Sequence, residues 1–220
     1  MTHDELVKMM YQVGGHDLRL GGPPYCTIHL PKFEFLAGRR NTQERLRRFG
    51  VGTEQLTGKT VLDLGCNVGG VAFECARLGA RFVCGLDIVA ERIAMANQIV
   101  KFCGLTDIYF EAGDIMADPS PFEGNSFDIV FCLALDGWVA DRQRLYKILG
   151  ELTRETLYLE THDGMVGHAT SAVAHVNETL ALLADNGFEH VEVLDEPQHD
   201  EADASKQHYR PNIVARKGRC

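Results

Sequence analysis

Short apolar runs alternate with longer stretches of helical period from residue 59 to the end of the chain. A strand that is buried on both faces reads as a continuous apolar run, whereas a helix that covers a sheet repeats its apolar positions every three or four residues. This alternation predicts an α/β fold in which crossover helices join the strands of a mostly parallel sheet. The expected strands cover residues 60–64, 81–86, 107–111, 127–133, 155–160, 188–194 and 211–217, and the expected helices cover residues 69–79, 90–103, 140–151 and 170–186.

The first 58 residues have a different pattern. A Gly/Pro-rich stretch, Gly14 to Pro31, is expected to break regular structure between two short helices. The second helix has a predicted N-cap, because Asn41 is followed three residues later by Glu44. We therefore expect two parts, residues 1–58 as an N-terminal helical extension that forms a lid over a substrate and residues 59–220 as one α/β domain. The two predicted helices cover residues 4–13 and 41–49.

The composition is that of a globular protein of the cytoplasm. Hydrophobic residues make up 45% and charged residues 24% of the chain, and no apolar run approaches the roughly 20 residues that span a bilayer. The N-terminus lacks the basic end and apolar stretch of a secretory signal. Most of the seven cysteines lie in apolar segments, which is typical of a reducing compartment, and without a Cys-x-x-Cys pair a thiolate zinc site has little support.

The net charge of −9 argues against a protein that coats nucleic acid, because such binding depends on Lys and Arg. The charge is uneven, with 8 Lys/Arg against 6 Asp/Glu in residues 1–58 and 14 against 25 in residues 59–220. Five arginines fall within ten residues: Arg39, Arg40, Arg45, Arg47 and Arg48. They indicate either a solvated helix face or a group that holds an anionic substrate.

The clearest motif is the run from Val61 to Gly70, in which a strand ending in Asp63 is followed by a tight turn at Gly65 and the start of a helix. Ligands of open α/β sheets bind at such strand ends. A dinucleotide site requires a second glycine where this chain has Asn67. Asp63 is also unfavourable beside a pyrophosphate, but it suits the amino group of a methionine moiety.

Acidic residues also follow the next two predicted strands. Asp87, 24 residues after Asp63, has the position of a carboxylate that accepts hydrogen bonds from both hydroxyls of an adenosine ribose. Asp114, after the third strand, has the position of an acceptor for the adenine amino group, with Ile88 and Ile115 on either side of the ring. Three neighbouring strand ends therefore present groups that match one adenosine-containing ligand.

These motifs, Val61 to Gly70 together with Asp87 and the Gly113-Asp114 pair, resemble the cofactor-binding motifs of class I S-adenosylmethionine-dependent methyltransferases. The resemblance implies S-adenosylmethionine as the cofactor and a Rossmann-like seven-stranded, mostly parallel sheet with helices on both faces and an antiparallel last strand. Many members have glycine at the position of Asn67. The cofactor-binding residues that it implies are Asp63, Gly65, Cys66, Asn67, Gly69, Asp87, Ile88, Gly113, Asp114, Ile115 and Leu133.

The acceptor of the methyl group is expected beyond the fourth and fifth strands. Methyl transfer to an acceptor with a proton of high pKa needs alignment and a base. His162 is the first candidate base because imidazole titrates near neutral pH, and Asp136 is the second. Trp138 is a candidate for stacking on a flat acceptor, and the N-terminal part contributes the acceptor-binding candidates Arg39, Arg40 and His29. A metal site made of Glu160, His162, His168 and His175 is not expected, because His162 and His168 fall in a Gly-bearing loop and His175 is expected on a helix surface.

The predicted function is methylation of an oxygen or nitrogen of a small molecule. An enzyme that methylates tRNA or another RNA is the alternative, favoured by the local arginines and by a weak similarity of Tyr25 to Pro31 to enzymes that modify the wobble uridine of tRNA. A third hypothesis is a non-catalytic partner subunit that binds S-adenosylmethionine. The acceptor, the methylated atom and the presence of a homo-oligomer stay open.

Overall fold

The computed structural model describes residues 2–13, 21–30, 33–119, 122, 124–161, 172–194 and 210–218. The chain divides into two compact units, Met1–Asp114 and Ile115–Cys220. Among the described residues, no helix has both the length and the apolar character needed to cross a membrane.

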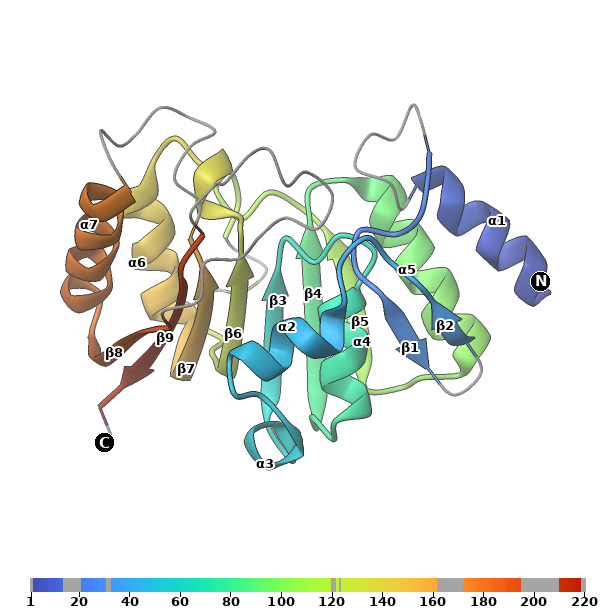
Figure 1. The fold of residues 1–220 in the computed structure, drawn as a ribbon, viewed down its shortest axis with the longest axis horizontal. Coiled ribbons are helices and arrows are strands. Elements are labelled where there is room, and N and C mark those ends of the chain that lie inside the picture. Colours follow the sequence, from blue (N-terminus) through green and yellow to red (C-terminus); the bar gives the residue numbers. More distant parts are fainter. Residues whose placement is uncertain are drawn as a thin grey trace. The chain divides into compact units, whose positions relative to one another are not determined.

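Three parallel strands form the centre of the first unit, in the order β5, β4, β3 (Figure 1). Leu64 lies opposite Leu86 and Asp87 lies opposite Ala112, so the carboxyl ends of the three strands meet at one edge. The sequence predicted all three strands to within one residue at either end. Their bounds are β3 (Thr60–Leu64), β4 (Phe82–Asp87) and β5 (Ile108–Ala112).

Two helices, α4 (Gly70–Arg77) and α5 (Ala90–Cys103), connect these strands. The α4 face that packs on the sheet includes Phe73, whose ring centroid lies 5.1 Å from that of Phe110 on β5. A Cβ atom at Gly69 or at Gly85 would overlap the ring of Phe110. Glycine at these two positions therefore lets an aromatic ring fill the space between the helix and the strands.

The N-terminal segment of the first unit is more regular than its sequence suggested. The first strand of a hairpin lies inside the Gly/Pro-rich stretch from Gly14 to Pro31. The expectation that this whole stretch breaks regular structure was therefore wrong. Ile28 and Leu30 are buried, and this strand packs against α4 (Figure 1). Burial of these apolar residues outweighs the local breakers. The elements are α1 (His3–Val13), β1 (Ile28–Leu30), β2 (Phe33–Leu36), α2 (Thr42–Arg48) and α3 (Thr53–Leu56).

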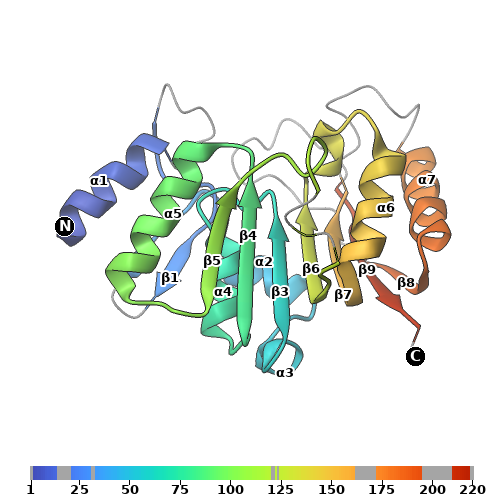
Figure 2. The same ribbon diagram turned by 180° about the vertical axis from the view of Figure 1, so that it is seen from behind.

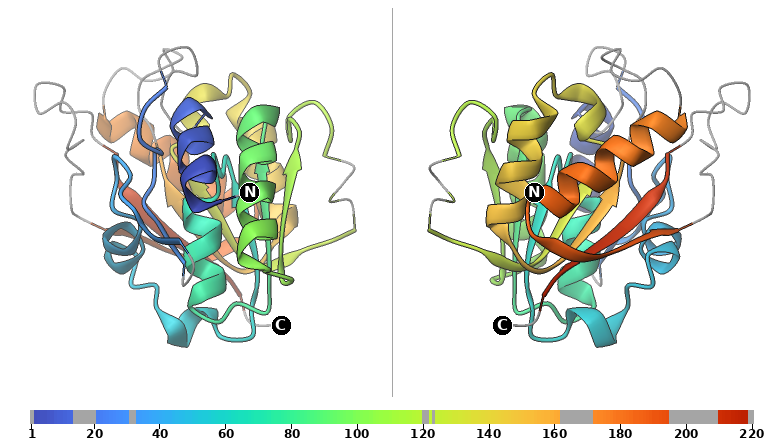
Figure 3. Two further views of the ribbon diagram at one scale, coloured as in Figure 1. Left: turned by 90° about the vertical axis from the view of Figure 1, so that its right-hand side faces the viewer. Right: turned by 90° about the vertical axis from the view of Figure 1, so that its left-hand side faces the viewer.

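The second unit contributes four strands in the order β6, β7, β9, β8. β6 and β7 are parallel, and β9 is antiparallel to both of its neighbours. Helices α6 and α7 lie side by side (Figure 2), and α7 packs on β8 (Figure 3). The bounds are β6 (Phe127–Leu133), η2 (Asp136–Trp138), α6 (Arg142–Leu152), β7 (Thr153–Glu160), α7 (Ala172–Asp185), β8 (Phe188–Leu194) and β9 (Asn212–Lys217).

The predicted α/β class is confirmed, because the chain contains a seven-stranded, mostly parallel sheet with helices. The division of the chain at residue 58 and the lid role of the preceding residues stay predictions. The predicted polar loop at residues 196–208 lies outside the described residues.

Candidate functional site

The turn after β3 has a backbone that requires unusual residues. Gly65, Asn67 and Gly69 have φ angles of 74°, 54° and 88°, in the left-handed region that favours glycine. Asn67 stands where many members of the resembling family have glycine, and asparagine tolerates this conformation better than most residues. Its Oδ1 accepts a hydrogen bond from the backbone N–H of Val68 at 2.8 Å. The substitution therefore keeps a left-handed backbone in the turn.

Asp87, at the end of β4, joins that turn to its own loop. One carboxylate oxygen accepts from the backbone N–H of Asn67 at 2.8 Å, and the other accepts from that of Val89 at 2.9 Å. The side chain is buried except for a small exposed part, while its neighbour Ile88 is 69% exposed. A carboxylate oxygen has more than one lone-pair site, so each can accept a further hydrogen bond from a ligand.

Asp63, at the end of β3, is 3% exposed and accepts from the backbone N–H of Ala72, in the first turn of α4, at 3.2 Å. Burial raises the pKa of its carboxyl from 3.8 to about 7, against a lowering effect of Arg45 and a smaller raising effect of Asp87. Removal of a carboxylate from water penalises its charged form. Near neutral pH this carboxyl is therefore poised between its two forms, and a bound cation would favour the charged one.

The end of β5 completes this edge of the first unit. The backbone N–H of Gly113 donates to the carbonyl oxygen of Asp87 at 3.0 Å, and Asp114 is exposed beside it. The structure therefore brings together the candidates that follow β3, β4 and β5. Ile115, which is buried, and Leu133, which is partly exposed, belong to the second unit, and their contact with a cofactor stays a prediction.

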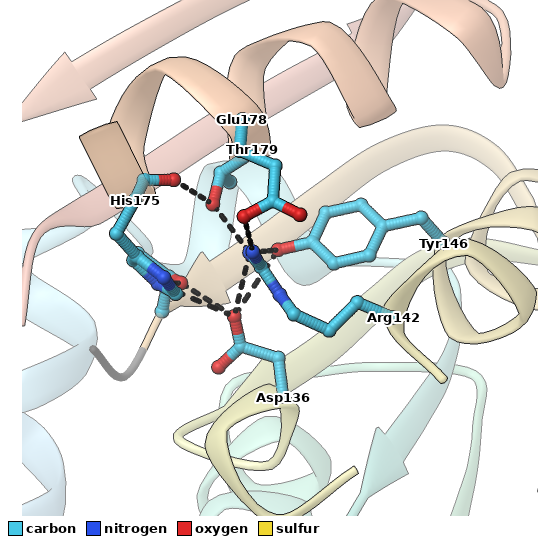
Figure 4. A network of polar contacts seen from close by, with 7 residues as sticks. Asp136, Arg142, Tyr146, His175, Glu178 and Thr179 are labelled. Atoms are coloured by element: carbon cyan, nitrogen blue, oxygen red, sulfur yellow. Dashed lines mark hydrogen bonds and ion pairs between the residues drawn. The ribbon is translucent and has the colours of Figure 1, made fainter. Parts of the chain in front are cut away.

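A network of buried polar side chains lies beyond the ends of β6 and β7 (Figure 4). At its centre is Asp136, which has no exposed surface and accepts hydrogen bonds from the hydroxyl groups of Tyr146, at 3.2 Å, and Thr161. Thr161 also contacts Nε2 of His175. The network ties η2, α6, the residue after β7, and α7 to one carboxylate. Asp136 is thus placed to hold these elements, and it reaches an acceptor only if the network opens.

Arg142, on α6, supplies positive charge to the same network. Its guanidinium lies 3.5 Å from the carboxylate of Asp136, donates to Thr179 at 2.7 Å and pairs with Glu178 at 2.6 Å (Figure 4). A buried carboxylate needs such donors, because removal of the partner of a buried charge destabilises a protein by about 3–5 kcal/mol. Arg142 and the hydroxyl groups of Tyr146 and Thr161 therefore account for the burial of Asp136.

His175 is buried within this network, so its expected place on a helix surface was wrong. It lies four residues before Thr179 on α7, and this spacing puts both side chains on one face of the helix. The first candidate base, His162, and the metal-site candidate His168 lie outside the described residues. In the part of the chain that the structure describes, no three His, Cys, Asp or Glu side chains are grouped to hold a metal ion.

Trp138 ends the η2 turn two residues after Asp136 and is 56% exposed. The turn follows Ala134, whose φ of 62° is unusual for a residue other than glycine. The backbone N–H of Ala134 donates to the carbonyl oxygen of Glu160 at 2.7 Å. Strained backbone of this kind is found often at functional sites. An exposed aromatic side chain is therefore held on a defined turn.

The arginines of the N-terminal segment differ in environment. Arg47 and Arg48 pair with Glu44 on the surface of α2, in agreement with a solvated helix face. Arg45 is only 6% exposed, so the expectation of a solvated face was wrong for this residue. Its position four residues before Phe49, an apolar residue that is also buried, was the sequence signal for burial.

The three acceptor-binding candidates of this segment lie in the first unit. Arg39 is exposed, and the guanidinium of Arg40 lies 5.2 Å from the ring centroid of Tyr25. His29 is exposed and shares a hydrogen bond of 2.8 Å with Gln43. Their contact with an acceptor stays a prediction.

The fold and the turn after β3 define an α/β protein with a Rossmann-like ligand site at the carboxyl ends of its strands. A sequence profile described as "Methyltransferase domain" matches residues 61–156. The ubiquinone biosynthesis O-methyltransferase of Neisseria meningitidis is 32% identical over 119 residues, which cover 54% of this chain and 47% of the relative. The chain thus spans about half the length of the curated relatives it matches.

Solved structures resemble the chain in fold. EvdMO1 has a TM-score of 0.67 and 20% identity, over 98% of this chain and 46% of its own. The magnesium protoporphyrin IX methyltransferase of Synechocystis PCC 6803, solved with bound S-adenosylmethionine, has a TM-score of 0.58 and 20% identity, over 82% of this chain and 79% of its own. The chain is therefore similar to methyltransferases in the sequence of residues 61–156 and in fold.

Proposed function

We propose that this protein is an enzyme that transfers the methyl group of S-adenosylmethionine to an oxygen or nitrogen atom of a small molecule. The observation that carries the proposal is the pair of carboxylates at the ends of adjacent parallel strands, Asp63 on β3 and Asp87 on β4, with a left-handed turn between them. The match of residues 61–156 to a methyltransferase domain supports the same conclusion, as does the O-methyltransferase activity named for the Neisseria relative.

The residues of the first unit fit the cofactor. Asp87, with both oxygens already fixed by backbone N–H groups, accepts from the two ribose hydroxyls. Asp63 attracts the ammonium group of the methionine end through its charge, since little of its surface is exposed. Ile88 offers an exposed apolar side chain to the adenine ring, and Asp114 accepts from the adenine amino group. When bound, S-adenosylmethionine supplies a methyl group on a positively charged sulfur.

On the acceptor side, the protein has to align the acceptor atom and, where that atom carries a proton of high pKa, remove the proton. Trp138 provides a flat, exposed surface on which a planar acceptor stacks. Asp136 acts here as a positioning residue that fixes the turn bearing Trp138. His162 remains the candidate base.

An RNA acceptor is the second candidate, favoured by Arg39 and Arg40 and opposed by the net charge of −9. A non-catalytic subunit that binds S-adenosylmethionine is the third. We also propose that the protein works in the cytoplasm, because most of its cysteines lie in apolar segments, as is typical of proteins in a reducing compartment.

One experiment separates these candidates. The protein is incubated with S-adenosylmethionine labelled in the methyl group and with a cell extract divided into a small-molecule fraction and an RNA fraction. At a cofactor concentration below the dissociation constant, the proposal expects label in the small-molecule fraction with the parent protein and much less with Asp87→Ala. Label in RNA alone would favour the second candidate, and cofactor binding without transfer to either fraction would favour the third.

A further inference from the structure

Arg45 places a buried positive charge in the first unit, where the sequence favoured a solvated helix face. Its side chain is 6% exposed, and Nη1 lies 3.9 Å from Sγ of Cys26, a contact at the long limit of hydrogen bonding to sulfur. Arg47, two residues later on α2, is largely exposed and pairs with Glu44. A guanidinium is buried only at a cost, so its environment calls for an explanation.

The segment that carries Arg45 packs directly on the start of α4. A Cβ atom at Gly70, the first residue of α4, would overlap the Cβ atom of Cys26 and come within 3.4 Å of the Thr42 hydroxyl. That hydroxyl donates to the carbonyl oxygen of Thr27 at 2.6 Å. The absence of a side chain at Gly70 thus allows α2 and the residues before β1 to approach the first turn of α4.

Asp63 lies at the same turn of α4. Its carboxylate accepts from the backbone N–H of Ala72, two residues after Gly70. Arg45 and Asp63 are therefore gathered at one helix N-terminus from segments 18 residues apart in the chain, and a buried pair of opposite charges interacts strongly because little water screens it.

We propose that Arg45 is a positioning residue of the cofactor site, whose buried positive charge sustains the negative charge of Asp63 that attracts the ammonium group of the cofactor's methionine end. The inference rests on the proposed function for the identity of that ligand. It gives the N-terminal segment a role in cofactor binding that is separate from a lid over the acceptor.

The other ionisable groups around Asp63 act in the opposite direction or are neutral. Asp87 raises the pKa of Asp63, whereas Arg45 is the cation that lowers it. The thiols of Cys66, Cys75 and Cys84 also interact with Asp63, and burial raises the pKa of each, so they carry no charge near neutral pH. Loss of Arg45 should therefore move the titration of Asp63 to higher pH.

The test measures the affinity for S-adenosylhomocysteine by calorimetry from pH 5.5 to 8.5. This ligand retains the ammonium group, and its own titration is common to all variants. We expect affinity for the parent to rise through about pH 7 as Asp63 ionises. In Arg45→Met the midpoint should move up by at least half a pH unit, which weakens binding about threefold or more below pH 7. Arg45→Lys should restore most of this loss.

Two comparisons decide between action on Asp63 and a general effect. Arg47→Met changes the same residue type on the same helix and should leave the profile of the parent unchanged. In an Asp63→Asn background, Arg45→Met should weaken binding no further, as expected if it acts through that carboxylate. An equal loss of affinity at every pH, or an additive loss in the double variant, would overturn the proposal.

Failure of the proposed function gives a different result. A parent protein that binds neither S-adenosylhomocysteine nor S-adenosylmethionine would contradict the methyltransferase assignment. The pH dependence of unfolding of the ligand-free protein still tests Arg45, because the inflection caused by Asp63 should move to higher pH in Arg45→Met, remain close to the parent's in Arg45→Lys and be absent in Asp63→Asn. An inflection that does not move in Arg45→Met would refute action on Asp63.

Discussion

Replacement of Asp63 by asparagine should stabilise the ligand-free protein at alkaline pH and weaken its hold on the cofactor. The pKa of Asp63 is about 7 in the folded chain against an ordinary value of 3.8. The folded chain therefore binds this proton more tightly than the unfolded chain does, so the contribution of Asp63 to stability falls as the pH rises from about 4 to about 7. Above pH 7, this difference in pKa means that the ionised carboxyl lowers the free energy of unfolding by at most about 4 kcal/mol.

Asparagine has nearly the same shape as aspartate and keeps an oxygen that accepts from the backbone N–H of Ala72. It carries no charge, so the cost of a buried carboxylate disappears. Part of the gain is offset, because Arg45 then loses the nearby negative charge. Asp63→Asn should therefore raise the free energy of unfolding relative to the parent. We expect this gain to be about 1–2.5 kcal/mol larger at pH 8 than at pH 5.

Urea unfolding at the two pH values measures this difference, with Asp107→Asn as the control at an exposed aspartate of the same unit. Calorimetry on the same variant should show at least tenfold weaker binding of S-adenosylmethionine. A gain in stability coupled to a loss of binding is the signature of a charge kept for function. If Asp63→Asn changes the free energy of unfolding equally at pH 5 and pH 8, or lowers it at pH 8, the raised pKa of Asp63 is refuted.

Three further outcomes follow from the site. Asp87→Ala should weaken S-adenosylmethionine binding by one to two orders of magnitude, about 1.5–3 kcal/mol, and unchanged affinity of a folded variant by calorimetry would remove the ribose assignment. S-adenosylmethionine should raise the melting temperature whereas NAD and NADP should not, and a shift with a dinucleotide alone would reverse the choice based on Asn67 and Asp63. Thr161→Val should lower the free energy of unfolding by about 1–3 kcal/mol, because the buried carboxylate of Asp136 loses a donor, while Thr161→Ser should stay near the parent; equal urea midpoints for the two variants would contradict the role of the hydroxyl.

The sequence by itself determined the order and type of the main elements from residue 59 onward, along with the turn after β3. This success has a local cause, since apolar period and turn residues act over a few neighbouring positions. The sequence also placed Asp63 and Asp87 at the ends of two strands, because each acid follows a run of apolar residues. Strand β7 begins at Thr153, two residues before the predicted start, since pairing with β6 sets that boundary.

Only the tertiary structure decided which distant residues meet. The hairpin of β1 and β2 forms despite nearby Gly and Pro residues because α4 covers β1, and nothing local in the sequence announces that partner. Helical spacing shows that Arg45 and His175 share faces with buried residues, but it does not show that the first lies near Asp63 or that the second contacts Thr161. Periodicity identifies the side of a helix that is buried, whereas the charge and hydrogen-bond partners of a buried group are set by segments far away in the chain.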